Sequence, residues 1–333
     1  MDIEAPSDLQ LLYAPIEPEL AKLSAFLEGE FASPEPFLWQ ILQHIARFRG
    51  KQIRPALVFL TGKLGLGETS EDQVKIAAVI ELIHTATLVH DDVLDDACLR
   101  RNVETVHLRW GERAAILIGD YIYSRAFHLS TQVPGMAGIL SDTTHTICEG
   151  ELLQIGNRFR PDLDEALYLE IIRKKTAILY AVSCELGGTL GGLDPERCQR
   201  LHALGMDLGM AFQIADDCLD YAGVETLAGK SLGTDLHQGK VTLPLIYLLE
   251  ALSQAERRWV REVLSKPLAA DDEARIAALV NRHGVVAEAF SKARSFVHSA
   301  KAILAEVVNG DPVVRSVRES LDQVADYMVR RQR

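Results

Sequence analysis

LVHDDVLDDACLRR, residues 88–101, and FQIADDCLDY, residues 212–221, carry the same DDxxD pattern in two distant parts of the chain. In each pattern the first and last aspartates are four residues apart, so on a helix they share one face. We expect the two carboxylate walls to face one cavity, where divalent cations would offset their charge. Mg²⁺ suits this role best, because it binds one or two carboxylates and fills its other positions with water and phosphate oxygens.

The alternative is that each acidic run is a solvated helix face, the usual interpretation of a single run. The residues that flank these runs are apolar instead. They are Leu88, Val89, Val93 and Leu94 around the first cluster and Phe212, Ile214, Ala215 and Leu219 around the second. This pattern predicts helices that are buried on most sides, where unpaired carboxylates would be costly.

The overall composition narrows the class of protein. The 333 residues carry a net charge of −12, which argues against a nucleic-acid partner. The acidic N-terminus lacks the apolar stretch of a signal peptide, and no apolar run approaches the ~20 residues of a membrane span. The cysteines form no CxxC pair and are interpreted as reduced, buried residues: Cys98, Cys148, Cys184, Cys198 and Cys218. These features predict a cytoplasmic protein.

The hydrophobic pattern predicts helix nearly throughout, and no period-2 strand run is found. The expected helices are 36–48, 52–64, 71–97, 111–130, 136–157, 164–187, 195–222, 241–252, 255–264, 272–283, 285–307 and 311–331. No linker is rich in proline or serine. We therefore expect one all-α domain over residues 1–333, with the motifs at about 48–250 and further helices at 255–331.

Cationic residues recur beside the acidic motifs, although each one alone is most often a solvated surface residue. Lys51 and Arg54 precede Pro55 in a glycine-led loop that enters a helix, a setting that favours anions. The other members of this set are Arg100, Arg101, Lys175, Lys230 and Lys240. His84, seven residues before Asp91, shares its helix face and is either structural or a ligand.

The sequence lacks a Walker-type loop, a GxGxxG motif, a GxSxG motif and an evident nucleophile beside a base. The absence of these motifs, together with the acidic and cationic residues, favours a reaction that needs metal and phosphate binding without covalent catalysis. Departure of a diphosphate is such a reaction, because metal ions and cations neutralise the charge on the leaving oxygens. The remaining carbocation needs apolar walls that exclude water, and the stretch VIELIHTATLV before Asp91 could supply one.

Taken together, the motifs resemble those of the trans-isoprenyl diphosphate synthases in order and spacing. These motifs are GKxxRP at 50–55, DDxxD followed by two arginines, KT at 175–176, FQ before the second DDxxD, and GK…GKxTLP at 229–244. The chain looks most like the long-chain members that make octaprenyl or solanesyl chains. The resemblance implies an all-α, isoprenoid-synthase-type bundle around a deep central cavity, typically a homodimer. It also implies head-to-tail addition of isopentenyl diphosphate to an allylic diphosphate, farnesyl or similar, with three Mg²⁺ ions.

The resemblance also implies roles for single residues. Asp91, Asp95 and Asp216 would bind Mg²⁺ directly, and Asp92, Asp217 and Asp220 would be further ligands or support them. Isopentenyl diphosphate would be held by Lys51, Arg54, His84 and Arg101. The allylic diphosphate would be held by Arg100, Lys175, Lys230 and Lys240. Thr176 and Gln213 would lie beside the reacting carbons, and the released diphosphate would take the final proton. A loose membrane association through the lipid product is expected as well.

Product length is expected to depend on the helix before Asp91. Short-chain members of the family have bulky aromatic residues four and five positions before the first aspartate. Thr87 and Ala86 occupy these positions here, and Ile83 lies in the preceding turn. None is aromatic, so we expect an open channel and a product of roughly six to ten isoprene units.

The chain departs from the family pattern at two positions. Asn102 and Arg49 stand where the family often has glycine, and we expect these changes to affect loop geometry more than chemistry.

Four other functions were weighed. A short-chain synthase would share every motif. A class I terpene cyclase would share the first DDxxD, but its second metal motif usually mixes Asn, Ser and Glu, and it needs no Lys51–Arg54 site. A metal phosphohydrolase that uses His84, His90 and Asp91 would leave the second cluster without a role. A silent subunit of a heteromeric synthase would usually have lost an aspartate motif, and both are complete here.

Overall fold

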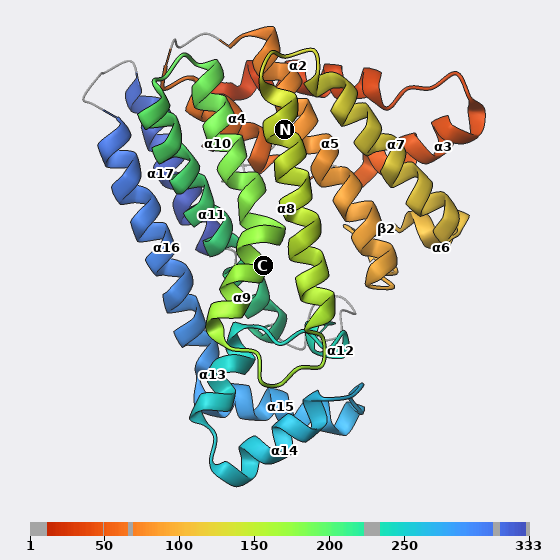
Figure 1. Ribbon diagram of the computed structural model, residues 1–333, viewed down its shortest axis with the longest axis vertical. Coiled ribbons are helices and arrows are strands. Elements are labelled where there is room, and N and C mark those ends of the chain that lie inside the picture. Colours follow the sequence, from red (N-terminus) through yellow and green to blue (C-terminus); the bar gives the residue numbers. More distant parts are fainter. Residues whose placement is uncertain (1–11, 49, 66–68, 223–233, 309–313, 331–333) are drawn as a thin grey trace, which may run out of the picture. The chain divides into compact units, whose positions relative to one another are not determined.

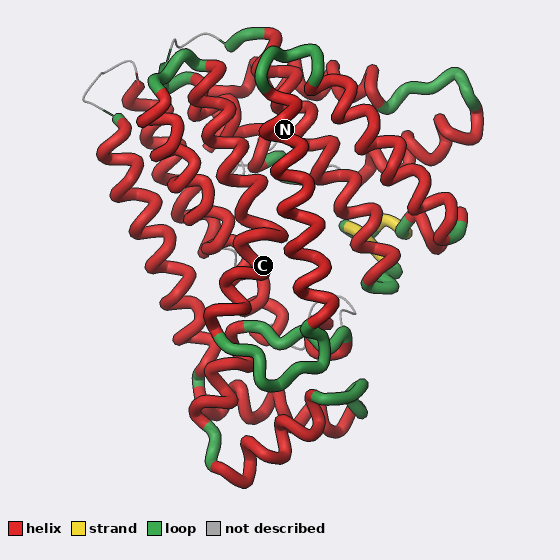
Figure 2. The backbone as a smooth tube through the Cα atoms, viewed as in Figure 1, coloured by secondary structure: helices red, strands yellow, loops and turns green. Residues whose placement is uncertain are grey.

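A computed structural model describes residues 12–48, 50–65, 69–222, 234–308 and 314–330. Within these residues the secondary structure is helical apart from one short hairpin (Figure 2). The all-α fold class predicted from the sequence is confirmed. None of the helices in the described part of the chain is long and apolar enough to cross a membrane.

The elements are labelled as in Figure 1. In the N-terminal part they are η1 (Ala14–Ile16), α2 (Glu17–Glu30), α3 (Pro36–Ile45), η2 (Ala46–Phe48), α4 (Ile53–Gly62), α5 (Glu71–Leu94), β1 (Leu99–Arg100), β2 (Val103–Glu104), α6 (Val106–Trp110), α7 (Glu112–Ser130) and α8 (Met136–Gly156). They continue with α9 (Glu165–Ile172), η3 (Arg173–Ala177), α10 (Ile178–Leu190), α11 (Pro195–Ala222), α12 (Thr234–His237), α13 (Leu243–Ala251), α14 (Gln254–Leu264), α15 (Ala270–His283), α16 (Val285–Val307) and α17 (Arg315–Arg330).

The chain divides into two compact units. The first consists of Met1–Thr144, Val182–His202 and Leu304–Gln323, and the second of His145–Ala181, Ala203–Ile303 and Val324–Arg333. The boundaries fall within helices α8, α10, α11, α16 and α17. The single domain and the deep central cavity expected from the sequence therefore stay predictions.

In the first unit, α5 packs against α4 and α7. A capping box starts α5: the Ser70 hydroxyl accepts from the Gln73 N–H at 3.2 Å, and the Gln73 side chain accepts from the Ser70 N–H at 2.8 Å. These two bonds satisfy amide groups that have no partner within the helix. Ile76 and Ile80, one turn apart, are fully buried. The cap and the buried face hold α5 in place, and its C-terminal end carries the first aspartate cluster.

In the second unit, the core is built around α13, which is buried on most sides. Pro244 lies in its first turn, where no helical N–H is lost. Leu243, Leu245 and Leu248 are fully buried in a cluster that also includes Tyr168 of α9 and Ile214 of α11. This packing fixes α9 and α11, the two helices that carry a central part of the site.

Several sequence-based expectations were wrong. Helix α2 was not predicted, although Leu23 and Leu27, one turn apart, form its buried side. The expected helix 164–187 is divided by a π turn at η3. The expected helix 71–97 is present within a few residues and ends at Leu94. A hairpin of two-residue strands follows it, which is too short to show a period-2 pattern.

The cysteine prediction was correct in part. All five cysteines are free, and Cys184, Cys198 and Cys218 are buried. Cys98 and Cys148 are exposed, contrary to expectation. Cys98 lies in the loop after α5, and Cys148 lies on α8.

Candidate active site

The first aspartate cluster lies at the C-terminal end of α5. Asp91 and Asp92 belong to its last turn, and Asp95 is the C-cap, whose N–H donates to the Asp91 carbonyl at 2.9 Å. The last turn has no basic residue. Carboxylates at the negative end of a helix dipole are unfavourable unless a cation is near. The position of the cluster therefore favours a bound cation.

Asp92 differs from its two neighbours. It is 1% exposed, and its Oδ1 accepts from Arg100 Nε at 2.9 Å and from another guanidinium nitrogen of Arg100 at 2.5 Å. Burial raises the pKa of Asp92, and the bonds from Arg100 act in the opposite direction. The carboxylate thus fixes Arg100, for which the family resemblance implies a contact with the allylic diphosphate. That role of Arg100 stays a prediction.

The hairpin that presents these arginines turns through two left-handed residues, Arg101 at φ 51° and Asn102 at φ 63°. Two positive φ values are typical of a type I′ turn, where asparagine is tolerated almost as well as glycine. The departure at Asn102 therefore keeps the loop geometry. The Arg101 guanidinium donates to the Phe48 carbonyl. A Cβ atom at Gly50 would lie 2.2 Å from this guanidinium, which explains the glycine that remains there.

His84 lies on α5 two turns before Asp91, among cations of the first unit. Burial, and then the charges of Arg54, Arg101 and Arg100, hold its pKa well below the usual range. A small pocket beside it is also lined by Arg101, Gln52 and Glu81. Lys51 is exposed and its carbonyl accepts from the Tyr13 hydroxyl at 2.8 Å. The structure thus brings His84 and three of the predicted arginines together.

The second aspartate cluster occupies the last two turns of α11, whose last turn has no basic residue. Asp216 is exposed, Asp217 is 5% exposed, and Asp220 is half-buried. The Asp220 carboxylate accepts from the Asp235 N–H at 3.1 Å. Burial, followed by the charge of Asp235, raises the pKa of Asp217 well above its usual range, whereas hydrogen bonds from Tyr168 and Gln213 lower it.

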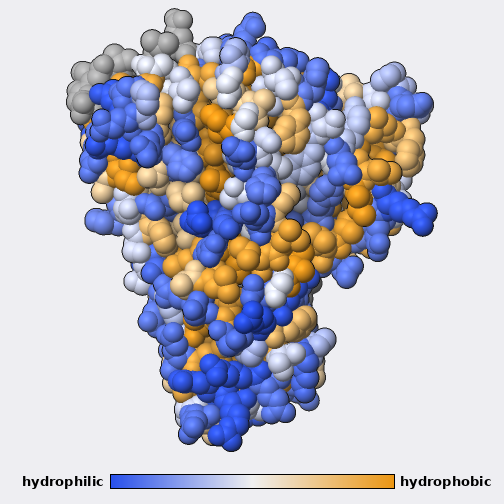
Figure 3. Space-filling model, in the orientation of Figure 1, coloured by the Kyte–Doolittle hydropathy of each residue, from blue (hydrophilic) through white to orange (hydrophobic). Residues whose placement is uncertain are grey.

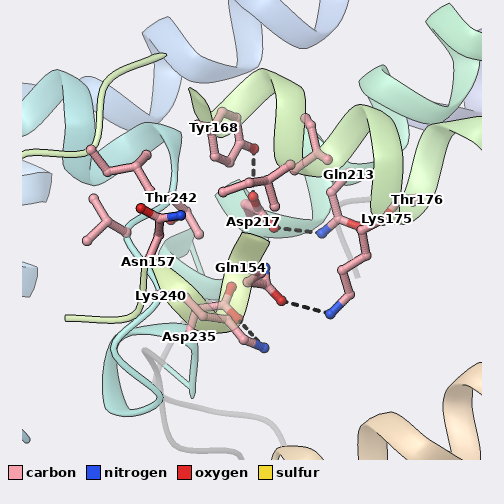
Figure 4. Close-up of a pocket in the computed structure, with 14 residues that line it drawn as sticks. Gln154, Asn157, Tyr168, Lys175, Thr176, Gln213, Asp217, Asp235, Lys240 and Thr242 are labelled. Atoms are coloured by element: carbon pink, nitrogen blue, oxygen red, sulfur yellow. Dashed lines mark hydrogen bonds and ion pairs between the residues drawn. The ribbon is translucent and has the colours of Figure 1, made fainter. Parts of the chain in front are cut away.

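A pocket of about 80 Å³ in the second unit joins Asp217 to other predicted residues (Figure 4). Lys175, Thr176, Gln213 and Lys240 all line it. Lys175 Nζ donates to Gln154 Oε1 at 2.7 Å and pairs with Glu151, while Lys240 Nζ is 3.7 Å from Asp235 Oδ1. The lysines are therefore held by acceptors of the protein at the pocket wall. Lys230 lies outside the described residues.

Lys175 and Thr176 lie in the π turn η3. π turns are frequent at functional sites because they change the direction of side chains within a helix. Gly150 of α8 permits this geometry: a Cβ atom there would lie 2.4 Å from the Lys175 amide nitrogen and 2.8 Å from the Lys174 carbonyl carbon. The close approach of α8 thus supports the turn that carries both residues.

The donor set can be tested against the expected metal. No group of three or more His, Cys, Asp or Glu side chains that could hold an ion is found among the described residues. Asp91 and Asp95 at the C-terminal end of α5, and Asp216 and Asp220 on α11, provide two carboxylates per motif in addition to the buried middle aspartates. Two carboxylates are what Mg²⁺ takes when water and phosphate oxygens fill its other positions. The residues therefore fit such an ion.

Sequence reasoning missed several residues of the site. Glu151 and Gln154 of α8 contact Lys175, and Tyr168 of α9 contacts Asp217. Asp235 contacts Lys240. The spacing of Glu151 and Gln154 in GELLQ, one helical turn, was the signal available for the first pair.

The residues expected to control product length lie on α5. Ile83 and Ala86 are buried, at 2% and 0% exposure, and the half-buried Thr87 donates from its hydroxyl to the His84 carbonyl at 2.7 Å. His90, the residue before Asp91, contacts α7 instead of the aspartates: its Nε2 lies 3.1 Å from the Ile116 carbonyl oxygen. The paired His90–Asp91 ligands of a metal phosphohydrolase are not supported by this geometry.

Known proteins are similar to this chain over most of its length. A family model described as polyprenyl synthetase matches residues 35–282. The chain is 36% identical to a short chain isoprenyl diphosphate synthase of Methanothermobacter thermautotrophicus, over 90% of this chain and 92% of that one. It is 33% identical to an all-trans-nonaprenyl-diphosphate synthase (geranyl-diphosphate specific) of Rhodobacter capsulatus, over 95% and 98%.

Among solved structures, the fold is similar to that of a polyprenyl synthase from Caulobacter crescentus, complexed with calcium and isoprenyl diphosphate. The TM-score is 0.90 at 33% sequence identity, and the match covers 98% of each chain. Its calcium ion agrees with a dependence on divalent metal in proteins of this kind.

Proposed function

Because the chain belongs to the polyprenyl synthetase family, whose named relatives are prenyltransferases, we propose that it joins isopentenyl diphosphate to an allylic diphosphate. The product is an all-trans polyprenyl diphosphate. The presence of two separate cationic groups carries this proposal. One surrounds His84 in the first unit, with Arg54 and Arg101, and the other lines the pocket of the second unit, with Lys175 and Lys240.

Two cationic groups suit a reaction with two diphosphate substrates. A terpene cyclase uses one diphosphate and would have no use for the group around His84. Both aspartate motifs are complete, which a silent subunit would not require. The assignment of isopentenyl diphosphate to the His84 group, with Lys51, and of the allylic diphosphate to the Lys175 and Lys240 group is part of the proposal.

The residues present account for the chemistry of the first step. Asp91, Asp95, Asp216 and Asp220 would hold Mg²⁺, in a proposed set of three ions, and the bound metal would neutralise charge on the leaving diphosphate. Lys175 and Lys240 bind the same diphosphate through charge-assisted hydrogen bonds. The carbonyl oxygen of Gln213 and the hydroxyl oxygen of Thr176 face the carbon that becomes positive, where the negative ends of their dipoles stabilise it.

Product length, assembly and location complete the proposal. We propose a long product because Ala86 and Thr87 leave the wall of α5 without an aromatic ring; the short-chain synthase among the relatives keeps the alternative open. The exposed apolar side of α7 supports a homodimer. The free cysteines support a cytoplasmic location, and the lipid product would bring the protein loosely to a membrane.

The deciding experiment measures steady-state kinetics with isopentenyl diphosphate, farnesyl diphosphate and Mg²⁺. Wild type should form prenyl products, and excess EDTA should abolish them. Arg54→Ala should raise KM for isopentenyl diphosphate, and Lys240→Ala should raise KM for farnesyl diphosphate. Each increase should be about tenfold to 10²-fold, which is the effect of losing a charge-assisted hydrogen bond. Lys22→Ala and Lys266→Ala, at exposed lysines of the two units, are matched controls. Full activity in EDTA contradicts the function, and equal effects of both variants on both substrates contradict the assignment of sites.

A further inference from the structure

A buried tyrosine contacts the middle aspartate of the second cluster. Tyr168 of α9 is 3% exposed, and its hydroxyl donates to Asp217 Oδ2 at 2.6 Å. Asp217 also accepts at Oδ1 from Gln213 Nε2, at 2.7 Å, one helical turn away on α11. Each oxygen of the carboxylate thus accepts a hydrogen bond from another side chain of the protein (Figure 4).

These two bonds fix the orientation of the Gln213 carboxamide. If the carboxamide were flipped while Asp217 is ionised, Gln213 Oε1 would face Asp217 Oδ1, two acceptors at hydrogen-bonding distance. With Asp217 ionised, the nitrogen therefore faces Asp217 and the oxygen faces the other way. There, Gln213 Oε1 accepts from the Thr176 hydroxyl at 3.0 Å.

The same bonds determine which hydrogen-bonding groups of Thr176 remain available in the pocket. Its hydroxyl hydrogen is used on Gln213, so its oxygen offers only lone pairs to any other group. Both Thr176 and Gln213 line the pocket of the second unit. The pocket wall at this point consists of acceptors held in one orientation, which suits a developing positive charge because no dipole has to turn during the reaction.

We propose that Tyr168 is a positioning residue for prenyl transfer, acting through the hydrogen-bond chain Tyr168–Asp217–Gln213–Thr176; the inference rests on the function proposed above. Tyr168 holds Asp217, Asp217 orients Gln213, and Gln213 orients Thr176. Asp217 is then an orienting group, with both oxygens in use, and the metal ions are held by Asp216 and Asp220 on this helix.

The test removes the tyrosine hydroxyl and keeps the ring. Tyr168→Phe should lower kcat about tenfold, less than the ~10²-fold that a fully misplaced group can cost. KM for isopentenyl diphosphate and the Mg²⁺ concentration for half-maximal activity should stay within about twofold of wild type. The reason is that the hydrogen-bond chain orients only groups that line the pocket of the second unit. Tyr247→Phe is the matched control: its hydroxyl donates to Glu165 Oε2 at 3.1 Å, in the same unit and away from the pocket lining. It should leave kcat unchanged.

A double-mutant cycle separates positioning from a merely structural role. Thr176→Val removes the last hydroxyl of the chain, so in that background Tyr168→Phe should change kcat by less than about twofold. Multiplicative losses in kcat, or a Tyr168→Phe protein that melts below the assay temperature while Tyr247→Phe does not, would overturn the inference. An unchanged kcat in Tyr168→Phe would also overturn it. An inactive wild type would overturn the function itself and is seen before any variant is made.

Discussion

At the scale of residues, the three aspartates of each DDxxD pattern are not equivalent. The middle ones, Asp92 and Asp217, are buried and bound to donors of the protein, Arg100 in one case and Tyr168 with Gln213 in the other. The resemblance implied direct Mg²⁺ ligands at Asp91, Asp95 and Asp216, and further ligands or supporting groups at Asp92, Asp217 and Asp220. It could not reveal the contacts of Arg100 with Asp92 and of Tyr168 with Asp217, because each of these donors lies on another element of the fold.

His84 leads to a prediction about stability and pH. Its folded-state pKa is lowered by burial and by Arg54, Arg101 and Arg100, with Glu81 lining the same pocket. Unfolded histidine titrates near pH 6.5, so below that pH the unfolded chain binds a proton that the folded chain does not. Stability should therefore fall as the pH falls from 7.5 to 5.5, by up to about 1 kcal/mol from this residue.

The measurement is urea unfolding of wild type and His84→Gln at pH 7.5 and 5.5. The loss of unfolding free energy between the two pH values should be smaller in His84→Gln. His298→Gln, at an exposed histidine of the second unit, is the control and should behave as wild type. An equal loss in wild type and His84→Gln would show that His84 gains its proton in the folded state as readily as in the unfolded one.

At the scale of elements, the long helices were the most predictable. Helices α5, α7, α11 and α16 were anticipated to within a few residues because each is a long uninterrupted apolar pattern. The π turn at η3 could not be predicted from RKKTA, since it depends on Gly150 of another helix. The same holds for the contacts of Lys175 with Glu151 and Gln154. The sequence predicted those site residues that belong to a recognisable motif. It did not predict those that reach the site only through the packing of separate helices.

Gly150 provides a test of the π turn. Gly150→Ala would place a Cβ atom 2.4 Å from the Lys175 amide nitrogen, so backbone must shift. We expect a loss of about 1–3 kcal/mol in stability, the usual cost of overpacking, and weaker binding of the allylic substrate. Gly156→Ala is the control on the same helix, because no atom lies within 4 Å of its Cβ. It should be neutral or stabilising. Thermal unfolding and KM values decide, and similar behaviour of the two variants would contradict the role of Gly150.

Helix α5 leads to a prediction about product length. Ala86 is fully buried, one turn after Ile83 and two short of Asp92. If the growing chain passes along this side of α5, Ala86→Phe should shorten the product, because a packed wall cannot take a ring without strain. Ala86→Leu should have an intermediate effect. Chromatography of the products measures this, with wild type expected at roughly six to ten isoprene units. A wild type that stops at farnesyl or geranylgeranyl diphosphate contradicts the long-chain proposal alone.

At the scale of the molecule, the fold class followed from the sequence, but the division into two units did not. Its boundaries lie inside helices, where no glycine, proline or polar linker marks them. A feature of the surface of α7 could not be predicted from the sequence either. On α7, Gly119 packs against His90 of α5, while Ile116, Leu117 and Tyr121 are 46%, 68% and 38% exposed. The face drawn in Figure 3 has exposed hydrophobic side chains (orange) between hydrophilic ones (blue).

A helix that is apolar on both sides is most stable when both sides are covered. The exposed side of α7 is equally available in every copy of the chain, so a second copy can cover it with its own α7 in a symmetric contact. Sedimentation velocity should therefore show a dimer for wild type. Leu117→Asp should yield monomers, because a carboxylate buried at the centre of such an interface has no partner.

Leu99→Asp is the matched control for this last prediction, since Leu99 is 63% exposed in the same unit but lies on β1. It should remain dimeric. A monomeric wild type, a dimeric Leu117→Asp, or loss of the dimer in both variants would show that α7 is not the contact. Circular dichroism of Leu117→Asp distinguishes dissociation from unfolding. A folded monomer would show that α5 and α6 suffice to hold α7 in place, and that its outer side serves the assembly.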